Sequence, residues 1–387
     1  MELQKKSVFA AACIGMLLFG VALISLGSIL PAVISKYHIN EMAAGTLASL
    51  LPFGILTGSF IFGPVVDRYG YKYLLIICAM LIILALEGIA FSNNYFSLKI
   101  FIFLIGFGGG IVNGTANALV NDISKEGRSA NLSLLGVFFG IGALGMPALI
   151  GSFSKVIPEN TIISLIGFLI LIPVIYFFLI KFPKPKLTQR FPLKESIRML
   201  KDPILVLMGF FLFFQGGVEG ITNNWTTTYL YNFITEEKEE ALFALSYFIL
   251  GLTLTRLLLS YLLRKFSPYL IQFISICTAA AGALILMFSL TYGLTVFGLV
   301  LLGIGFAAGF PVLLGYVGEL YKKLSGTAFS FVMVIALAGN MLINYIMGLT
   351  AHYFGIKYFS SLLLICLLIM IVILYFVVKK ISPKINV

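Results

Sequence analysis

Long apolar runs recur along the whole chain and are separated by short polar or turn-forming gaps. Each run has the length of a spanning helix, which needs about 20 mainly apolar residues. Short alternating strands of about 10 residues, the signature of an outer-membrane barrel, are not the pattern here. We therefore predict twelve membrane-spanning helices, near residues 8–34, 43–66, 72–92, 97–121, 130–154, 161–180, 203–231, 241–263, 268–290, 293–318, 326–350 and 358–378.

Composition narrows the class of protein further. Of the 387 residues, 60% are hydrophobic and only 11% are charged, and the mean hydropathy is +1.07. Soluble domains carry roughly 25% charged residues, and disordered chains have low hydrophobicity. A soluble enzyme and a disordered chain are therefore both excluded.

The net charge of +11 comes mainly from loops on one predicted side of the membrane. With the N-terminus inside, twenty of the 26 Lys and Arg residues fall in inside segments. The positive-inside rule then predicts that both termini and the central loop are cytoplasmic. This placement favours contact with anionic lipids over nucleic-acid binding. The first span is too long for a signal-peptide core, so we expect it to stay in the mature protein.

The chain divides into two halves around its longest polar segment, from Lys181 to Asp202. We predict an N-terminal six-helix bundle at 1–181, a cytoplasmic linker at 182–202 and a C-terminal bundle at 203–387. Matches at an offset of 196 to 197 residues support a duplication: Gly54 with Gly251, Asp67 with Arg264, Asp122 with Glu319, and Ser129 with Ser325. The fold class is thus all-α, with twelve spans in two pseudo-symmetric bundles.

The loop after the second span carries a recognisable motif, Gly63-Pro64-Val65-Val66-Asp67-Arg68-Tyr69-Gly70-Tyr71-Lys72. It resembles the loop signature of the major facilitator superfamily, with Tyr71 in place of a basic residue. The resemblance implies the family fold, and a gating role in which the loop acid helps to hold the two halves together on the cytoplasmic side. The gating candidates are Gly63, Asp67, Arg68, Gly70, Lys72, Asp122, Arg256 and Glu319. For Asp122 and Glu319, ordinary solvated helix ends are an equal alternative.

Three stretches also look like the fucose–galactose–proton symporter group and related bacterial sugar permeases. They are Asn113 to Asn117, Gln215 to Trp225, and Gly309-Phe310-Pro311. This second resemblance implies a sugar substrate and proton coupling. Two departures argue against proton coupling of that type. No basic residue lies between Lys99 and Lys125, so the fourth span lacks the arginine that many proton-coupled members carry, and the first span has no acidic residue.

Glu219 lies near the middle of the seventh span, where a carboxylate is costly and usually faces a cavity or a partner. Gln215, Glu219, Thr222, Asn223 and Thr226 follow the spacing of one helix face. We predict that this polar stripe binds substrate and that Glu219 takes up and releases a proton. The alternative is a structural contact, for example with Arg256. That pairing would keep Glu219 ionised and weaken a proton-carrier role; otherwise the Arg256 stem extends toward the cytoplasmic boundary.

Side-chain amides recur at helical spacing in two other spans. Asn113, Asn117 and Asn121 share a face of the fourth span, and Asn340 and Asn344 share a face of the eleventh. Amides both donate and accept hydrogen bonds, so they suit sugar hydroxyls, although the same groups also join helices to one another. Asn121 is expected to be structural. The predicted substrate-binding residues are Asn113, Asn117, Gln215, Glu219, Asn223, Trp225, Asn340 and Asn344.

Two features outside these stripes have competing interpretations. Trp225, the single tryptophan, either stacks on a sugar ring or anchors the helix at the membrane interface. Glu236, Glu237, Glu239 and Glu240 are expected to form a solvated acidic loop outside the membrane.

These patterns predict a transporter and not an enzyme. The sequence carries no phosphate loop, metal spacing or nucleophile motif, and its four cysteines lie apart within spans. No cofactor and no metal is expected. We predict a monomeric secondary transporter that works by alternating access, with a midplane site, importing a sugar or similar small polar metabolite with a proton (or sodium). The alternative is proton-driven efflux of amphipathic compounds, which the 36 Phe residues would suit.

Overall fold

The computed structural model describes residues 2–123, 128–183, 202–235, 237–321 and 325–381. Within these ranges the chain forms helices and no strand, and twelve spans are long and apolar enough to cross a membrane. The predicted all-α, twelve-span fold is confirmed. The helices of the first half are α1 (Glu2–Tyr37), α2 (Glu41–Tyr69), α3 (Tyr71–Phe91), α4 (Tyr95–Ile123), α5 (Arg128–Phe153), α6 (Glu159–Leu169) and α7 (Leu171–Leu179).

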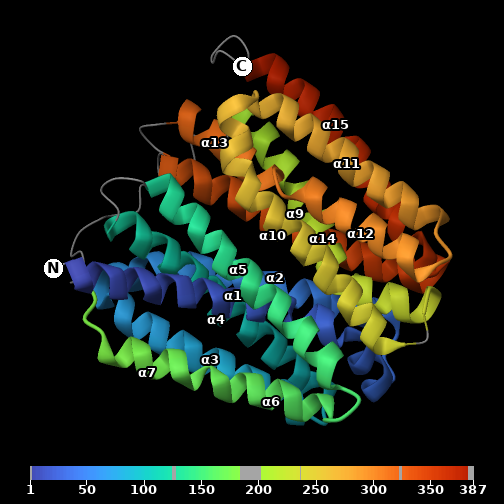
Figure 1. Cartoon of the computed structure of the whole chain (residues 1–387), viewed down its shortest axis with the longest axis horizontal. Coiled ribbons are helices and arrows are strands. Elements are labelled where there is room, and N and C mark those ends of the chain that lie inside the picture. The colour runs from blue at the N-terminus through green and yellow to red at the C-terminus, as the bar shows by residue number, and fades with distance from the viewer. Residues whose placement is uncertain (1, 124–127, 184–201, 236, 322–324, 382–387) are drawn as a thin grey trace. The chain divides into compact units, whose positions relative to one another are not determined.

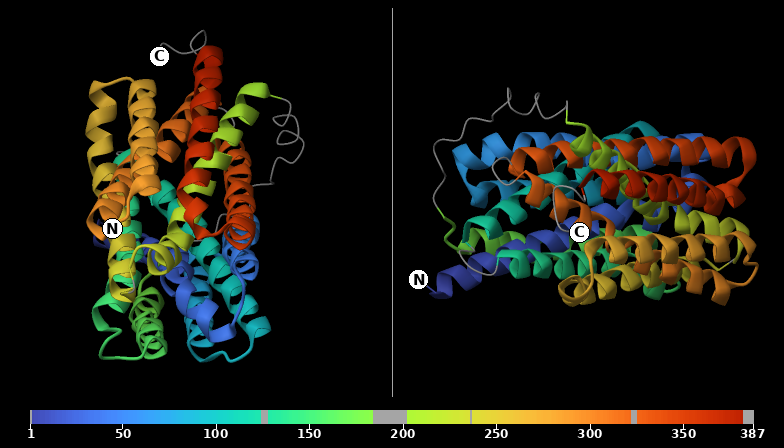
Figure 2. Two further views of the ribbon diagram at one scale, coloured as in Figure 1. Left: turned by 90° about the vertical axis from the view of Figure 1, so that its right-hand side faces the viewer. Right: turned by 90° about the horizontal axis from the view of Figure 1, so that it is seen from above.

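The second half contains α9 (Pro203–Phe233), α10 (Lys238–Lys265), α11 (Pro268–Phe288), α12 (Tyr292–Phe306), α13 (Gly309–Leu320), α14 (Ser325–Phe354), the short 3₁₀ helix η2 (Ile356–Tyr358) and α15 (Phe359–Ile381). The α11 and α12 helices lie side by side in Figures 1 and 2. Most of the predicted linker at 182–202 lies outside the described residues, so the predicted domain boundaries stay a prediction.

The chain forms two compact units. Unit 1 contains Met1–Ile39, Leu50–Gln189 and Glu237–Ser246, and unit 2 contains Asn40–Ser49, Arg190–Glu236 and Tyr247–Val387. Unit 1 thus includes the first turns of α10, and unit 2 includes the first turns of α2. Each unit therefore gains a piece of helix from the opposite half of the sequence.

Glycine contacts repeat between the two units at the offset expected from the sequence. In unit 1, α2 meets α4 so closely that a side chain at Gly54 or Gly106 would strike the backbone of Phe103 or Leu51. The residues 197 positions later make the same contacts in unit 2, where Gly251 faces the carbonyl of Val300 and Gly303 that of Phe248. The duplication therefore extends to individual helix contacts.

A second helix pair obeys the same relation. Gly142 of α5 lies against the backbone of Leu17 in α1, as Gly339 of α14 lies against Phe213 in α9. Figure 1 shows α1 beside α5 in unit 1. Close backbone approach at small residues is the usual basis of helix packing in membranes, where lipid offers no hydrophobic driving force between helices.

The span predicted at 293–318 is divided into α12 and α13 by a break at Ala307 and Ala308. Pro311 has no N–H to donate to the carbonyl of Ala307, and its ring is incompatible with a regular helix there. The helix restarts with the bond from Val312 N to Ala308 O at 3.0 Å. The break leaves backbone carbonyls without helical partners, and discontinuous helices of this kind line substrate sites in many transporters.

Asp202 stabilises the start of α9. Its Oδ1 accepts a hydrogen bond from Ile204 N at 2.9 Å, and its Oδ2 accepts one from the Tyr321 hydroxyl at 2.6 Å. Burial raises the pKa of Tyr321, and the bond to Asp202 and its negative charge raise it further. The phenol therefore stays protonated and donates the bond that ties the end of α13 to the start of α9.

We expect the Asp202→Ala variant to be less stable than the parent by about 1–2 kcal/mol, because it loses an N-cap and a side-chain hydrogen bond. The Asp202→Asn variant keeps a capping oxygen and should lose less. The melting temperature of purified protein in detergent measures both effects. An alanine variant that melts with the parent would show that this contact adds nothing to stability.

Candidate functional site

The carboxylate of Glu219 is bound from two sides in the middle of α9. Gln215 lies one turn earlier, and its Nε2 donates to Glu219 Oε1 at 2.7 Å and to the carbonyl of Phe306 at 3.1 Å. Phe306 is the last residue of α12, so the Gln215 amide connects the carboxylate to the helix break. The break thus supplies an acceptor that a continuous helix would not offer.

Gly309, the first residue of α13, leaves the space that the Gln215 amide occupies. A Cβ at Gly309 would lie 2.7 Å from Gln215 Nε2 and closer still to Oε1. The absence of a side chain at this position is therefore required for the contact between α9 and the break. In the Gly309-Phe310-Pro311 stretch, the glycine thus makes space for the Gln215 amide and the proline breaks the helix.

Arg256 of α10 provides the positive charge near Glu219. Its Nη2 lies 3.7 Å from Glu219 Oε1, and the two side chains are 23% and 16% exposed. The sequence left open whether Arg256 pairs with Glu219 or extends toward the cytoplasmic boundary, and the structure has the pair. A mostly buried carboxylate with a nearby guanidinium forms a nearly neutral unit, which lowers the cost of placing the charge at this depth.

A second polar cluster joins α9 to α14. Asn224 Nδ2 donates to Asn344 Oδ1 at 3.1 Å, and Asn344 Nδ2 donates to Asn340 Oδ1 at 2.8 Å. Gly220 makes room for these amides, because a Cβ there would lie 2.7 Å from Asn344 Nδ2. Asn224 Oδ1 is buried without a partner among the described atoms. The chain of amides therefore ends in an unused acceptor.

Asn224 was not among the predicted site residues, whereas its neighbour Asn223 was. Asn223 shares the helix face of Glu219 and is half-buried, but Asn224, 3% exposed, is the residue that bonds to α14. Successive residues of a helix are about 100° apart, so a one-residue difference changes the neighbour that a side chain meets. The i, i+4 spacing from Gly220 was the sequence signal that could have indicated Asn224.

The rest of the predicted polar stripe is structural. Thr222 Oγ1 donates to the carbonyl of Val218 at 2.7 Å, and Thr226 Oγ1 donates to that of Thr222 at 2.6 Å. Both threonines are fully buried. Their hydroxyls bond to the preceding turn of their own helix, as Ser and Thr commonly do within helices. Within the stripe, Glu219 and Asn223 keep partly exposed side chains, whereas Gln215 and the two threonines are buried.

Trp225 is fully buried, and its indole Nε1 has no partner among the described atoms. A tryptophan that anchors a helix at the membrane surface keeps its ring edge in the headgroup region. Complete burial contradicts that alternative. Contact with a substrate ring stays a prediction for this residue.

Unit 1 has an amide pair of its own. Asn117 Nδ2 donates at 2.9 Å to both the backbone O and the side-chain Oδ1 of Asn113, and it lies 3.9 Å from the Met16 sulfur of α1. Both asparagines are half-buried. The predicted sharing of one face of α4 holds for this pair, while the side chain of Asn121 lies outside the described residues.

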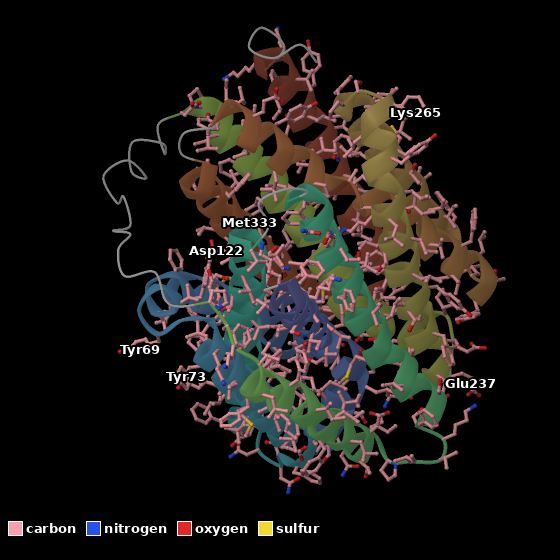
Figure 3. The ribbon with its side chains drawn as sticks, turned by 60° about the vertical axis from the view of Figure 1, so that its left-hand side comes forward. Tyr69, Tyr73, Asp122, Glu237, Lys265 and Met333 are labelled. Carbon is pink, nitrogen blue, oxygen red and sulfur yellow. The ribbon has the colours of Figure 1, made fainter. Side chains whose placement is uncertain are left out.

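The predicted gating residues have different surroundings. Gly63, Asp67 and Arg68 fall in the last turns of α2, with the side chains of Asp67 and Arg68 outside the described set. Gly70 caps α3 with a φ of 80°, which favours glycine. Tyr69 and Tyr73, on either side of it, point away from the ribbon in Figure 3.

The remaining gating candidates lie at other helix ends. Lys72 Nζ donates to the carbonyl of Phe178 in α7 at 2.5 Å. Asp122, labelled near the end of α4 in Figure 3, accepts a hydrogen bond from the Tyr71 hydroxyl. Glu319 is exposed. Asp122 thus ties α4 to the start of α3, and the gating roles stay predictions.

Glu87 of α3 is a charged residue within a span that the sequence interpretation missed. The Ser164 hydroxyl of α6 lies 2.8 and 3.0 Å from its two carboxylate oxygens. An acid inside an apolar run was the available signal. Among the described residues, no group of three or more His, Cys, Asp or Glu side chains is arranged to hold a metal ion.

The Gln215–Glu219 pair has no polar counterpart at the equivalent positions of the other copy of the duplicated scaffold. Gly20 and Gly216 approach α5 and α14 at equivalent positions, 196 residues apart. At this offset Phe19 and Leu23 of α1 correspond to Gln215 and Glu219 of α9. The same helix packing thus carries polar residues on α9 in unit 2 and apolar residues at the equivalent positions of α1 in unit 1. The glycine contacts that set the fold do not determine which residues occupy these positions.

Comparison with known proteins agrees with this fold. The sequence model of the Major Facilitator Superfamily matches residues 12–292 and 228–386. The chain is 24% identical over 353 residues to the glucose/mannose transporter GlcP of Bacillus subtilis (strain 168), and the match covers 85% of this chain and 84% of GlcP.

Solved structures show the same arrangement at lower identity. A nucleoside transporter, NupG, superposes with a TM-score of 0.77 at 16% identity, covering 97% of this chain and 98% of NupG. A D-xylose-proton symporter superposes with a TM-score of 0.78 at 15% identity, covering 95% and 97% of the two chains. Such likeness concerns the fold. With the family match across almost the whole chain, it shows that this protein belongs to the major facilitator superfamily and is a multi-pass membrane transporter, not an enzyme.

Proposed function

We propose that the protein imports a small neutral polyhydroxy metabolite, such as a hexose, together with a proton. The observation that carries this proposal is the polar cluster of unit 2, in which Gln215, Glu219, Asn340 and Asn344 present carboxylate and amide groups within spanning helices. Amides donate and accept at once, as sugar hydroxyls do. The similarity to GlcP, a glucose/mannose transporter, supports the same substrate class.

The charge balance of the cluster favours a neutral substrate. Glu219 faces the Arg256 guanidinium at 3.7 Å, so no net charge is left to attract an ionic solute. Most buried polar groups are paired when no substrate is present, and the bonds among the amides provide these partners for all of the cluster's amides except the Asn224 Oδ1 acceptor. A sugar can replace them bond for bond, because each hydroxyl both donates and accepts.

Proton coupling, in this proposal, arises from competition for Glu219. A proton on the carboxyl removes the charge that holds Arg256, whereas loss of that proton restores the pair. The two protonation states therefore differ in the contact between α9 and α10. Without such competition the ion pair would keep Glu219 ionised, and transport would be uncoupled from protons.

The proposed setting is a bacterial inner membrane with both termini in the cytoplasm, which follows from the distribution of Lys and Arg. The protein acts as a monomer by alternating access, and Asn113 and Asn117 also bind substrate hydroxyls. Proton-driven efflux of amphipathic compounds is the competing outcome. It would appear as transport of apolar dyes without response to sugars.

In proteoliposomes, a sugar panel added outside should raise the external pH when a transported sugar is present, because a proton enters with it. We expect Glu219→Gln to abolish this pH change while sugar exchange across the membrane continues, since a neutral amide mimics the protonated acid. A pH electrode and radiolabelled sugar measure the two activities in parallel.

Arg256→Gln is the informative partner variant. This variant should leave sugar exchange intact and shift the pH dependence of uptake. Without the Arg256 guanidinium, no fixed positive charge competes with the proton for the Glu219 carboxylate. Normal uptake with unchanged pH dependence in Glu219→Gln would refute the carrier role, and a dye response without any sugar response would favour efflux.

The amide cluster can be displaced without removing a polar group. We expect Gly220→Ala to weaken sugar binding about tenfold, the loss of roughly one hydrogen bond, because its Cβ displaces Asn340 and Asn344. Gly315→Ala in α13 is the control, since nothing lies within 4 Å of an added Cβ there. Isothermal titration of both variants makes the comparison, and equal affinities would place the substrate away from this cluster.

A further inference from the structure

We propose that Glu41 and His352 form a pH-sensitive latch between the first turns of α2 and the last turns of α14. With the N-terminus inside, as proposed above, these helix ends lie at the outer face of the membrane. The inference uses that orientation but no assumption about the substrate or the coupling ion.

The first turns of α2 pack closely against the last turns of α14. Residues Asn40–Ser49 belong to unit 2 together with α14. A Cβ at Gly45 would lie 2.7 Å from the Cα of Gly348, so the two backbones touch. One turn further along, Ser49 Oγ donates to the carbonyl of Met341 at 2.8 Å. The first turns of α2 are thus held to α14 by backbone packing and a hydrogen bond.

The charged pair lies at the outer end of this contact. His352 Nδ1 is 3.6 Å from Glu41 Oε2, and the side chains are 32% and 39% exposed. Histidine changes charge between about pH 5 and 8, and it attracts a carboxylate electrostatically only in its protonated form. Since water partly screens the pair, its effect on an equilibrium is modest, about two- to fivefold.

Glu41 is the acid that pairs with His352, and the neighbouring rings and charges are the following. The ring of Tyr353 packs edge-on against the imidazole at a centroid distance of 4.9 Å. On η2, which packs against α14, the Lys357 ammonium lies over the ring of Tyr358 at 5.4 Å. Tyr229 and Tyr231 lie near the same end of α9, Lys36 and His38 precede α2 along the chain, and the first two turns of α15 carry no titratable side chain.

Unit 1 contains a corresponding contact that is built from lysines and acids, without a histidine. Lys155 lies 3.5 Å from Glu237 and 3.8 Å from Glu239, and Lys238 pairs with Glu159 of α6. Figure 3 shows Glu237 at the start of α10. Glu237 is 61% exposed, as the predicted solvated acidic loop requires, whereas Glu239 is 19% exposed and lies in the first turn of α10. These pairs tie the start of α10 to the α5–α6 turn.

Any movement that frees the first turns of α2 must break the Glu41–His352 pair. An acidic exterior favours the charged form of a histidine and so retards that movement, whereas a neutral exterior favours the uncharged form. The ion pairs of unit 1 use lysine, a residue type that keeps its positive charge in both acidic and neutral solution.

The test measures release of α2 directly. Ser49→Cys, a half-buried position, is labelled from outside with a membrane-impermeant maleimide, with and without His352→Gln. The ratio of the two rates at each pH cancels the pH dependence of the thiol. We expect labelling with His352 present to be about two- to fivefold slower than with Gln at about pH 5.5, and equal at about pH 7.5. The parent chain, which keeps its serine at this position, corrects for labelling of the exposed native Cys277.

Lys155→Gln in the same Ser49→Cys background is the matched control, and its effect on labelling should be the same at both pH values. A rate ratio for His352→Gln that does not change with pH would overturn the latch. Absence of labelling in every variant and at both pH values would overturn it too, because α2 would then never leave α14. Neither result depends on whether the protein carries a sugar or a proton.

Discussion

A carboxylate at membrane depth needs a partner, and the arrangement around Glu219 follows from that requirement. The Gln215 amide and the Arg256 guanidinium supply hydrogen bonding and opposite charge. The amide reaches the carboxylate because Pro311 breaks the tenth span and Gly309 leaves space beside the break. A continuous helix would have used the Phe306 carbonyl internally. The cost of burying one charge thus accounts for the broken helix, the glycine and the position of an arginine within a span.

The two units share their helix contacts but differ in their polar residues. Glycines at equivalent positions bring α2 to α4 and α10 to α12, so both units share one set of backbone contacts. The polar residues do not follow this symmetry, because Phe19 and Leu23 occupy the positions of Gln215 and Glu219. Backbone contacts between helices tolerate few substitutions, whereas side chains on a helix face can diverge. A carboxylate–amide pair on one copy alone is the expected result of duplication followed by divergence of side chains.

The fold was predictable from the sequence, and the site only in part. Hydropathy and loop charge indicate the spans because the bilayer requires continuous apolar helices, and a shared offset revealed the repeat. The pairing of Gln215 with Glu219 follows from helical spacing. Asn224 was missed because the sequence does not say which neighbour each face meets. Arg256 was ambiguous because its long stem allows two directions. The burial of Trp225 and the lysine pairs near Glu237 depend on contacts between segments far apart in the chain.

The most direct measurement of the central claim is the position of a transported hexose in an experimentally determined structure of the complex. The account places the sugar against the Glu219–Gln215 pair and the amides of Asn340 and Asn344, with its hydroxyls replacing bonds that those groups now make to each other. Sugar density elsewhere, with the bonds of Glu219, Gln215 and the α14 asparagines unchanged, would contradict the assignment of this cluster as the substrate site.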